Sequence, residues 1–245
     1  MQLIVLAAGK GTRLPKKFRK NPKCLVKINK KPLIYYNEPF YKKFDKKIII
    51  SGYKTKNLET SLKKMNFQFI NNKNYKSTNM VYSLSLAKQY IKQDVVVVYG
   101  DIIFNSSLFK ILKTKDNLLP VNRNWFKNWK KRMGLQKTLI DAENLIIKKK
   151  LISEIGTKIN SKKIPNYQYM GVMKFKKDTF VKIISFFYSL KNKKIDMTSF
   201  LNLCIKNKIL KMRAKFYYSY WYEIDTASDH KFAQKEIKKF YDKKK

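Results

Sequence analysis

The chain begins with the stretch QLIVLAAGKGTRL (residues 2–14), in which four apolar residues lead into a small-residue loop that contains two glycines. Branched apolar residues favour a strand, and the loop lets backbone amides turn toward an anion such as phosphate. Lys10 lies between the glycines, so the loop is not a Walker A motif. Leu14 stands where a dinucleotide-binding loop needs its third glycine. The stretch therefore favours a phosphate-binding turn, with a simple tight turn as the alternative.

The composition is typical of one globular domain. Of the 245 residues, 44% are hydrophobic and 14% are aromatic. The longest apolar runs have the length of strands, so we expect no membrane span. No signal-peptide pattern is present at the N-terminus, and Cys24 and Cys204 form neither a metal pattern nor a disulfide framework. We therefore expect a cytoplasmic protein, because that compartment is reducing.

The net charge of +40, from 56 basic and 16 acidic residues, would normally indicate binding to nucleic acid or to an anionic membrane. The basic residues are spread over the whole chain, however, and they accompany many Asn, Ile and Tyr residues, as a compositional bias would place them. Aromatic RNA-binding patterns and zinc spacings are absent. We expect no specific nucleic-acid binding, and a basic nucleic-acid-binding protein is kept as a remote alternative.

The order of the predicted elements indicates the fold class. In the first hundred residues, strand-like runs at 3–6, 47–51, 67–70 and 94–99 alternate with helical patterns at 32–44, 58–65 and 79–91. This alternation predicts an α/β fold with a doubly wound, mostly parallel mixed sheet. Later, alternating runs near 138–155 and 167–175 are followed by helices near 177–190 and 197–206, a strand at 211–217 and a basic helix from about 226.

Two parts of the sequence are expected to meet at one edge of the sheet. Ligands of open α/β sheets bind beyond the carboxyl ends of the strands. Gly9 to Arg13 follow the first strand, and Gly100 and Asp101 follow the apolar run at 95–99. Lys23, after Asn21 and Pro22, adds a cation on a rigid turn. An anion-binding loop, a lysine and a carboxylate at one edge suggest a triphosphate with a divalent metal ion.

These motifs resemble the nucleotidyltransferase family, which couples an NTP to a phosphorylated acceptor and releases pyrophosphate. Residues 6–13, Pro22 with Lys23, and the strand that ends at Asp101 match its signature in order and spacing. Other segments are similar to the bacterial phosphocholine cytidylyltransferase-like branch, which includes enzymes for aminoethylphosphonate and phosphoglutamine. These segments are 78–83, 125–132, 141–143, 154–156, 169–171, 196–199 and 221–225. Residues 133–140 depart from the branch, because they are longer and lack its Asn-Pro.

The resemblance implies one domain over 1–245 with a Rossmann-like nucleotidyltransferase fold. Residues 1–120 would mainly bind nucleotide, 121–225 would form a mixed acceptor-binding subdomain, and 226–245 would form a C-terminal helix. It also implies transfer of CMP from CTP to a small phosphate- or phosphonate-bearing amine in cell-surface biosynthesis, by a monomer or homodimer. A sugar-1-phosphate nucleotidyltransferase is the alternative, because it shares the generic motifs.

Roles at the nucleotide are carried over with the resemblance. Nucleotide binding is implied for Leu6, Ala7, Ala8, Gly9, Gly11, Thr12, Arg13, Asn79, Ser83 and Gly100. Arg13 would contact the β- and γ-phosphates, and Lys23 would bridge the α-phosphate and the acceptor phosphate. Asp101 and Asp225 would hold Mg²⁺, which completes a catalytic set with Arg13 and Lys23. The alternative for Asp101, Asp225 and Asn79 is that each caps the N-terminus of a helix.

Acceptor binding is expected at Lys23, Trp125, Trp129, Asp141, Glu143, Glu154, Tyr169, Gly171 and Trp221. Aromatic faces beside carboxylates suit an acceptor that carries an ammonium group. Core packing is the alternative for at least one tryptophan, and pairing with a lysine is the alternative for Glu154. The reaction needs no general base, because the acceptor phosphate is already ionised at pH 7. The only histidine, His230, is accordingly expected on the surface.

Overall fold

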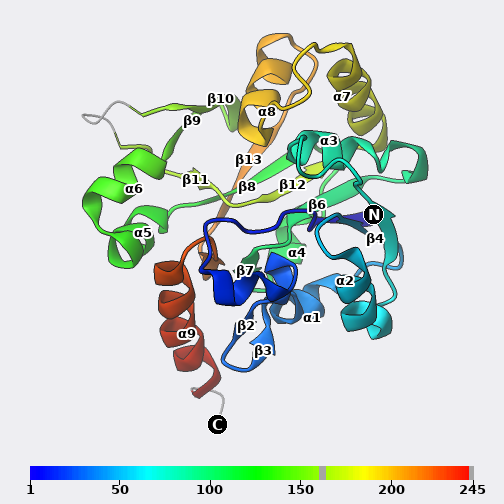
Figure 1. Cartoon of the computed structure of the whole chain (residues 1–245). Helices are drawn as coiled ribbons and strands as arrows, with labels where there is room; N and C mark the ends of the chain where they lie inside the picture. The colour runs from blue at the N-terminus through cyan, green and yellow to red at the C-terminus, as the bar shows by residue number, and fades with distance from the viewer. Residues whose placement is uncertain (160–163, 243–245) are drawn as a thin grey trace.

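The computed structural model describes residues 1–159 and 164–242, and most of its strands form one large twisted sheet (Figure 1). Four parallel strands in the order β5-β4-β1-β6 make up the first half of this sheet: β5 (Gln68–Asn71), β4 (Lys47–Ser51), β1 (Gln2–Leu6) and β6 (Val95–Tyr99). β1, β4 and β6 consist largely of buried Leu, Ile and Val, as parallel strands covered on both faces require.

Beyond β6 the sheet is mixed. It continues as β12 (Val172–Phe175), β8 (Leu118–Asn122), β13 (Arg213–Tyr217), β10 (Leu151–Lys158) and β9 (Glu143–Lys148), with β11 (Gln168–Tyr169) paired to β8. β12 is antiparallel to both of its neighbours, whereas β13 runs parallel to β8. The predicted α/β fold with a mixed sheet is confirmed.

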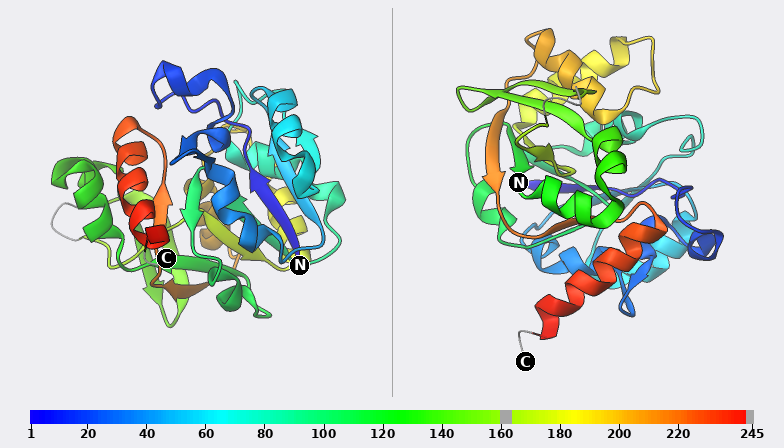
Figure 2. Two further views of the ribbon diagram at one scale, coloured as in Figure 1. Left: turned by 90° about the horizontal axis from the view of Figure 1, so that it is seen from below. Right: turned by 90° about the vertical axis from the view of Figure 1, so that its left-hand side faces the viewer.

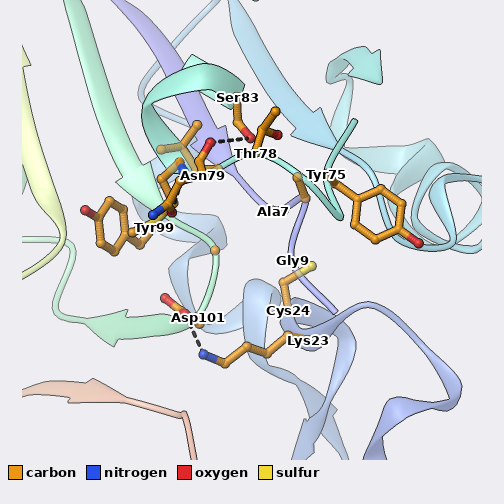
Figure 3. A pocket seen from close by; sticks show the side chains of 14 residues that line it. Ala7, Gly9, Lys23, Cys24, Tyr75, Thr78, Asn79, Ser83, Tyr99 and Asp101 are labelled. Carbon is orange, nitrogen blue, oxygen red and sulfur yellow. Dashed lines mark hydrogen bonds and ion pairs between the residues drawn. The ribbon is translucent and has the colours of Figure 1, made fainter. Parts of the chain in front are cut away.

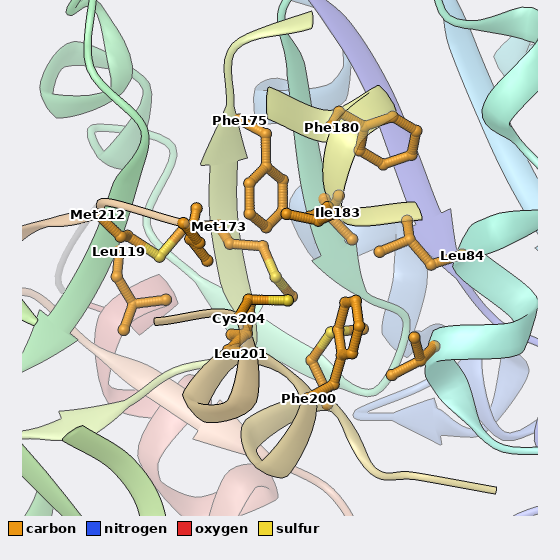
Figure 4. Close-up of a cluster of buried hydrophobic side chains, with 14 of the residues drawn as sticks. Leu84, Leu119, Met173, Phe175, Phe180, Ile183, Phe200, Leu201, Cys204 and Met212 are labelled. Atoms are coloured by element: carbon orange, nitrogen blue, oxygen red, sulfur yellow. The ribbon is translucent and has the colours of Figure 1, made fainter. Parts of the chain in front are cut away.

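Helices cover both faces of the sheet, as in a doubly wound fold. One face carries α3 (Met80–Ser85), α7 (Lys177–Ser189) and α8 (Met197–Lys206), and the other carries α1 (Glu38–Tyr41), α2 (Thr55–Leu62) and α4 (Leu108–Leu112). Each layer has its own buried apolar cluster. Figure 4 shows Leu84, Ile183 and Phe200 of the first layer around Met173 and Phe175 of β12.

Several smaller elements bring the C-terminal part of the chain back to the sheet. β7 (Ile102–Phe104) pairs with β14 (Trp221–Glu223) in an antiparallel ladder that aligns Ile102 with Glu223. Because β7 follows Asp101 and β14 precedes Asp225, this ladder brings the two aspartates together. The remaining elements are α5 (Trp125–Met133), α6 (Leu135–Asp141), α9 (Ala227–Asp242) and the hairpin of β2 (Lys27–Ile28) and β3 (Lys31–Pro32). α9 packs beside α5 (Figure 2).

Some predicted elements have other bounds in the structure. The helix expected at 32–44 is a 3-10 turn, Leu33–Asn37, followed by the short α1, and the helix expected at 79–91 ends at Ser85. The alternating pattern expected at 138–155 is wrong at its start, because residues up to Asp141 belong to α6. The pattern starts with only one apolar pair, Leu139-Ile140, and so short a run does not distinguish a strand from a helix. The predicted C-terminal helix is α9, and residues 243–245 of that prediction lie outside the described residues.

β8 lies in the middle of the sheet, although its sequence gives little indication of a strand. Pro120 stands at its centre and faces Lys215 of β13 in the parallel ladder. Proline lacks the N–H that a ladder needs, so its presence argues against a central strand on sequence grounds.

Among the described residues, no helix is long and apolar enough to cross a membrane.

We expect Gly156→Ala to destabilise the fold more than Gly134→Ala. Both glycines have a φ of +81°, so both substitutions carry the strain of a left-handed backbone. A Cβ at Gly156 would lie 2.6 Å from Thr198 Cβ, at the irregular part of the β10–β9 ladder, whereas nothing lies within 4 Å of one at Gly134. Chemical denaturation should show a free energy of unfolding about 1–3 kcal/mol lower for Gly156→Ala than for Gly134→Ala. Equal losses would contradict this packing.

Candidate active site

The first part of the site lies where β1 and β6 end side by side. Leu6 and Tyr99 are partners in the parallel ladder, so the loop after β1 and the turn after β6 leave the sheet together. The Gly100 amide donates to the Leu6 carbonyl at 2.9 Å. A Cβ on Gly100 would lie 2.9 Å from that same oxygen, so a larger residue does not fit. Figure 3 shows the resulting pocket, with Gly9 and Asp101 at its border.

The glycine-containing loop is held by its own turn and by one arginine. The Leu14 amide donates to the Gly11 carbonyl at 3.1 Å, and Gly11 has a φ of +70°. Arg19 Nε donates to the Leu14 carbonyl at 2.6 Å, and its Nη2 donates to the Thr12 carbonyl. The sequence gives no reason to single out Arg19 among the many basic residues of this loop. Its role here is to fix the backbone that carries Arg13.

Lys23 is at the centre of the four predicted catalytic residues. Its Nζ donates to Asp101 Oδ2 at 2.6 Å and also to Asp225 Oδ1. Arg13 Nη2 forms an ion pair with Asp225 Oδ2 at 2.9 Å. Asp101 is followed by β7, so it does not cap a helix. The structure therefore brings Arg13, Lys23, Asp101 and Asp225 into one cluster.

Asp225 precedes α9, but another residue supplies the cap. Asp229 Oδ2 accepts hydrogen bonds from the backbone amides of Asp225 and Thr226 at 2.9 and 2.8 Å. The Asp229 amide in turn donates to Thr226 Oγ1 at 3.3 Å, which completes a capping box. The Asp225 carboxylate is thus left to face Lys23 and Arg13.

The charges of this cluster stabilise one another. Burial acts to lower the pKa of Lys23, but the neighbouring Asp101 and Asp225 more than compensate, so this pKa is raised above its ordinary value. Burial acts to raise the pKa of Asp225, and the charge and hydrogen bond of Lys23 outweigh it, so this pKa is lowered. The ammonium and the Asp225 carboxylate are therefore both charged at neutral pH.

Two carboxylates at this point fit a divalent cation. Within residues 1–159 and 164–242 there is no group of three or more His, Cys, Asp or Glu side chains that could hold a metal ion. Mg²⁺, however, is ordinarily bound by one or two carboxylates together with substrate phosphates and water. Asp101 Oδ1 is buried and has no hydrogen-bond partner among the described residues, while its Oδ2 faces Lys23. Asp101 and Asp225 therefore suit a hard ion that arrives with a triphosphate.

The pocket at the end of β1 and β6 has a volume of about 160 Å³. The predicted nucleotide-binding residues that line it are Leu6, Ala7, Ala8, Gly9, Asn79, Ser83 and Gly100, and Tyr75, Thr78 and Tyr99 join them. Gly11 and Thr12 lie farther along the loop. Asn79 is the N-cap of α3, because its Oδ1 accepts from the Met80 amide at 2.7 Å. Ser83 Oγ accepts from Asn72 Nδ2 at 2.9 Å, so Asn72 is a residue that the sequence analysis missed.

A second pocket, of about 220 Å³, adjoins the first, since Met80 and Tyr99 line both. The predicted residues that line it are Arg13, Trp129, Asp141, Glu143, Tyr169, Gly171, Trp221 and Asp225. Gln168 also lines it, together with Asp196, Thr198 and Glu223, which lie in the segments 196–199 and 221–225 of the resemblance but were not predicted as site residues. With five acidic residues in its lining, this pocket is rich in carboxyl groups. Burial, and then the nearby charges of Asp225 and Asp101, raises the pKa of Glu223.

Two residues expected at the acceptor lie elsewhere. Trp125 belongs to the core, with 1% of its surface exposed, and its Nε1 donates to the Pro165 carbonyl at 3.1 Å. Core packing is thus the correct alternative for Trp125. Glu154 lies on β10 and accepts a hydrogen bond from the Thr157 hydroxyl, and it pairs with no lysine of residues 1–159 and 164–242. Neither residue lines the second pocket.

The expectation of a surface position for His230 is wrong. The side chain is buried between Phe18, whose ring centroid lies 4.5 Å away, and the Lys27 carbonyl, 2.9 Å from Nε2. The cause is that α9 docks on the β2–β3 hairpin, which the sequence does not indicate. His230 therefore has a packing role that its place in a basic terminal helix does not suggest.

The aromatic faces of the second pocket are largely taken by protein groups. The Trp129 ring packs on Trp125 and Trp221, with centroid distances of 5.3 and 5.9 Å. The Arg132 guanidinium lies over Trp129, 4.9 Å from the ring centroid. Trp221 Nε1 is buried and has no hydrogen-bond partner among the described residues. The pocket thus offers carboxyl groups more readily than it offers open aromatic faces.

Comparison with known proteins connects this geometry to a family. Residues 3–115 match the model of the MobA-like NTP transferase domain. The chain is 33% identical to a CTP:phosphoglutamine cytidylyltransferase of Campylobacter jejuni, over 94% of this chain and 97% of that protein. It is 31% identical to a choline-phosphate cytidylyltransferase of Streptococcus pneumoniae, over 58% of this chain and 65% of that protein.

Solved structures share the fold at low sequence identity. The inositol-1-phosphate CTP transferase of T. maritima superposes with a TM-score of 0.78 at 20% identity, over 97% of this chain and 96% of that chain. The CTP:phosphocholine cytidylyltransferase of Streptococcus pneumoniae gives 0.76 at 23% identity, over 96% and 98%. The cluster around Lys23, the two adjoining pockets and the full-length relative lead to one conclusion: the chain belongs to the nucleotidyltransferase family, in the branch of bacterial cytidylyltransferases.

Proposed function

We propose that this chain transfers CMP from CTP to the phosphate or phosphonate of a small nitrogen-bearing acceptor and releases pyrophosphate. The observation that carries the proposal is the position of Lys23, whose ammonium lies between Asp101, which lines the first pocket, and Asp225, which lines the second. The relatives named for cytidylyl transfer to phosphoglutamine and to choline phosphate support CTP as the donor. The cytoplasmic location, the role in cell-surface biosynthesis and the monomeric or dimeric state stay predictions.

The chemistry needs positioning and charge neutralisation more than proton transfer. An ionised oxygen of the acceptor phosphate attacks the α-phosphorus, a new P–O bond forms, and the bond from the α-phosphorus to the pyrophosphate oxygen breaks. Lys23 would draw the two anionic groups together, and Arg13, which is largely exposed, would reach the outer phosphates. We propose Mg²⁺ as the divalent ion, held by Asp101 and Asp225 and supplying charge neutralisation at the phosphates.

The second pocket favours an acceptor whose nitrogen carries hydrogen atoms. Asp141, Glu143 and Asp196 can accept hydrogen bonds from an amine or an amide. A quaternary ammonium has no N–H to donate and depends on open aromatic faces. Arg132 already lies over Trp129, and Trp221 is buried against it. Phosphocholine should therefore be a poor acceptor for this chain.

The aspartates provide one test. Asp101→Asn and Asp225→Asn should each lower CTP- and acceptor-dependent pyrophosphate release by about a hundredfold or more, because each removes a charge that would bind the metal ion at the triphosphate. The side chains are of equal size, so the circular dichroism spectrum should be unchanged. Asp116→Asn is the matched control. Asp116 Oδ2 lies 2.8 Å from Arg213 Nε, and neither residue lines either pocket. Full turnover in both Asp101→Asn and Asp225→Asn would refute the metal assignment.

A pair of acceptors that differ only in three methyl groups provides a second test. We expect kcat/KM for phosphoethanolamine to exceed that for phosphocholine by at least about tenfold, which corresponds to one lost hydrogen bond to a charged group. Steady-state pyrophosphate release at saturating CTP measures both values. Phosphocholine as the equal or better acceptor would show that the second pocket binds ammonium through its aromatic rings after all.

A further inference from the structure

Arg132 is a buried cation that the sequence analysis did not include among the site residues. It lies in the last turn of α5, and only 6% of its side chain is exposed. A guanidinium in such a position requires anionic or carbonyl partners, because desolvation of an unpaired charge is costly. Arg132 lines neither of the two pockets described above, so contact with a substrate there does not explain its burial.

The partners of Arg132 come from the segment that carries Asp225. Its Nε lies 3.2 Å from Asp229 Oδ1, in an ion pair without hydrogen-bond geometry whose acidic side chain is only 4% exposed. Its Nη1 donates to the Glu223 carbonyl at 3.3 Å. The Asp141 carboxylate is a more distant partner, with Oδ2 3.9 Å from Nη2. Arg132 thus holds residues on both sides of Asp225, which stands between Glu223 and Asp229 in the sequence.

Asp229 divides its two carboxylate oxygens between Arg132 and the backbone of Asp225. Oδ1 faces the guanidinium, and Oδ2 accepts from the amides of Asp225 and Thr226. The Asp225 side chain then points to Lys23 and Arg13. A shift of the Asp229 carboxylate would therefore move the Asp225 backbone and, with it, the carboxylate that faces Lys23.

We propose that Arg132 and Asp229 are positioning residues: they form a brace that fixes the Asp225 carboxylate against Lys23 and Arg13. The catalytic effect of the brace rests on the proposed function, since it acts through Asp225. Asp229 reaches the cluster around Lys23 only through the backbone amide of Asp225, and Arg132 acts through Asp229 and the Glu223 carbonyl. The brace also connects α5, which carries Trp129 of the second pocket, to the start of α9.

The competing explanation is that Arg132 merely docks α5 on α9. The chain supplies a matched control for this explanation, because Lys131 on the same helix pairs with Glu236 of α9 at 3.0 Å. That ion pair also joins α5 to α9, and it has no contact with the segment around Asp225. Lys131→Met therefore removes a link between the helices and leaves the brace intact.

The experiment compares Asp229→Asn, Arg132→Met, the double variant and Lys131→Met by melting temperature, kcat and KM. An asparagine still has an oxygen that can accept from the two backbone amides, but its NH₂ group would face the Arg132 guanidinium, so repulsion replaces the ion pair and displaces the side chain from its place against the Asp225 backbone. We expect Asp229→Asn to lower kcat about tenfold or more with little change in the KM for CTP or acceptor. Lys131→Met should keep kcat within about twofold, as expected for an exposed ion pair.

The double variant distinguishes a brace from two independent effects. If Arg132 and Asp229 act as one unit, the double variant should lose no more than about the larger of the two single losses in kcat. Losses that multiply, or a kcat loss that Lys131→Met shares, would overturn the proposal. An Asp229→Asn variant with wild-type kcat would overturn it as well.

A crystal structure of Asp229→Asn keeps this result separate from the test of the proposed function. The brace requires the Asp225 carboxylate in that variant to leave hydrogen-bond distance of Lys23 Nζ, whether or not the wild type releases pyrophosphate. An unmoved Asp225 would refute the brace even in an active enzyme. A wild-type protein that releases no pyrophosphate with any acceptor would instead refute the proposed function alone.

Discussion

The contact of the Lys23 ammonium with the carboxylates of Asp101 and Asp225 is the constraint on which the rest of the site depends. It requires three distant parts of the chain to converge: the turn after Pro22, the end of β6 and the end of β14. Gly100 lets the end of β6 approach the loop after β1, Gly11 of that loop lies against the Lys23 side chain, and the β7–β14 ladder brings in the end of β14. Within this arrangement a buried lysine stays charged, because burial alone would lower its pKa and the two carboxylates raise it.

The distribution of acidic residues would let a chain of net charge +40 bind both a triphosphate and the proposed amine. Six of its 16 acidic residues line the two pockets: Asp101, Asp141, Glu143, Asp196, Glu223 and Asp225. The spread of basic residues attracts a polyanionic nucleotide from all directions. The carboxylates concentrate the opposite charge where a metal ion and a protonated amine would be needed. The net charge of +40 is thus consistent with this site without a nucleic-acid partner.

Sequence reasoning reached those parts of the site that short motifs encode. The loop after β1, Lys23 after a proline and Asp101 after a buried strand are local patterns, and the sheet edge brings them together. Sequence reasoning did not predict Arg132, Glu223 and Asp229 as site residues, because their roles arise from tertiary contacts between α5, β14 and α9. Trp125 and Trp129 lie four residues apart on one helix, and only the packing distinguishes the core residue from the one that lines the pocket. β8 was missed because Pro120 contradicts a central strand.

The most direct test of the account is pyrophosphate release by the purified protein in a screen of the four NTPs against small phosphate- and phosphonate-bearing acceptors, with glucose 1-phosphate included. Carboxylates around the second pocket suit a protonated amine, whereas a sugar has no positive charge to place there. The account predicts release with CTP only, at one pyrophosphate for each CDP-linked product, and only when a nitrogen-bearing acceptor is present. Preference for glucose 1-phosphate, or for another NTP, would contradict it and favour a sugar-1-phosphate nucleotidyltransferase.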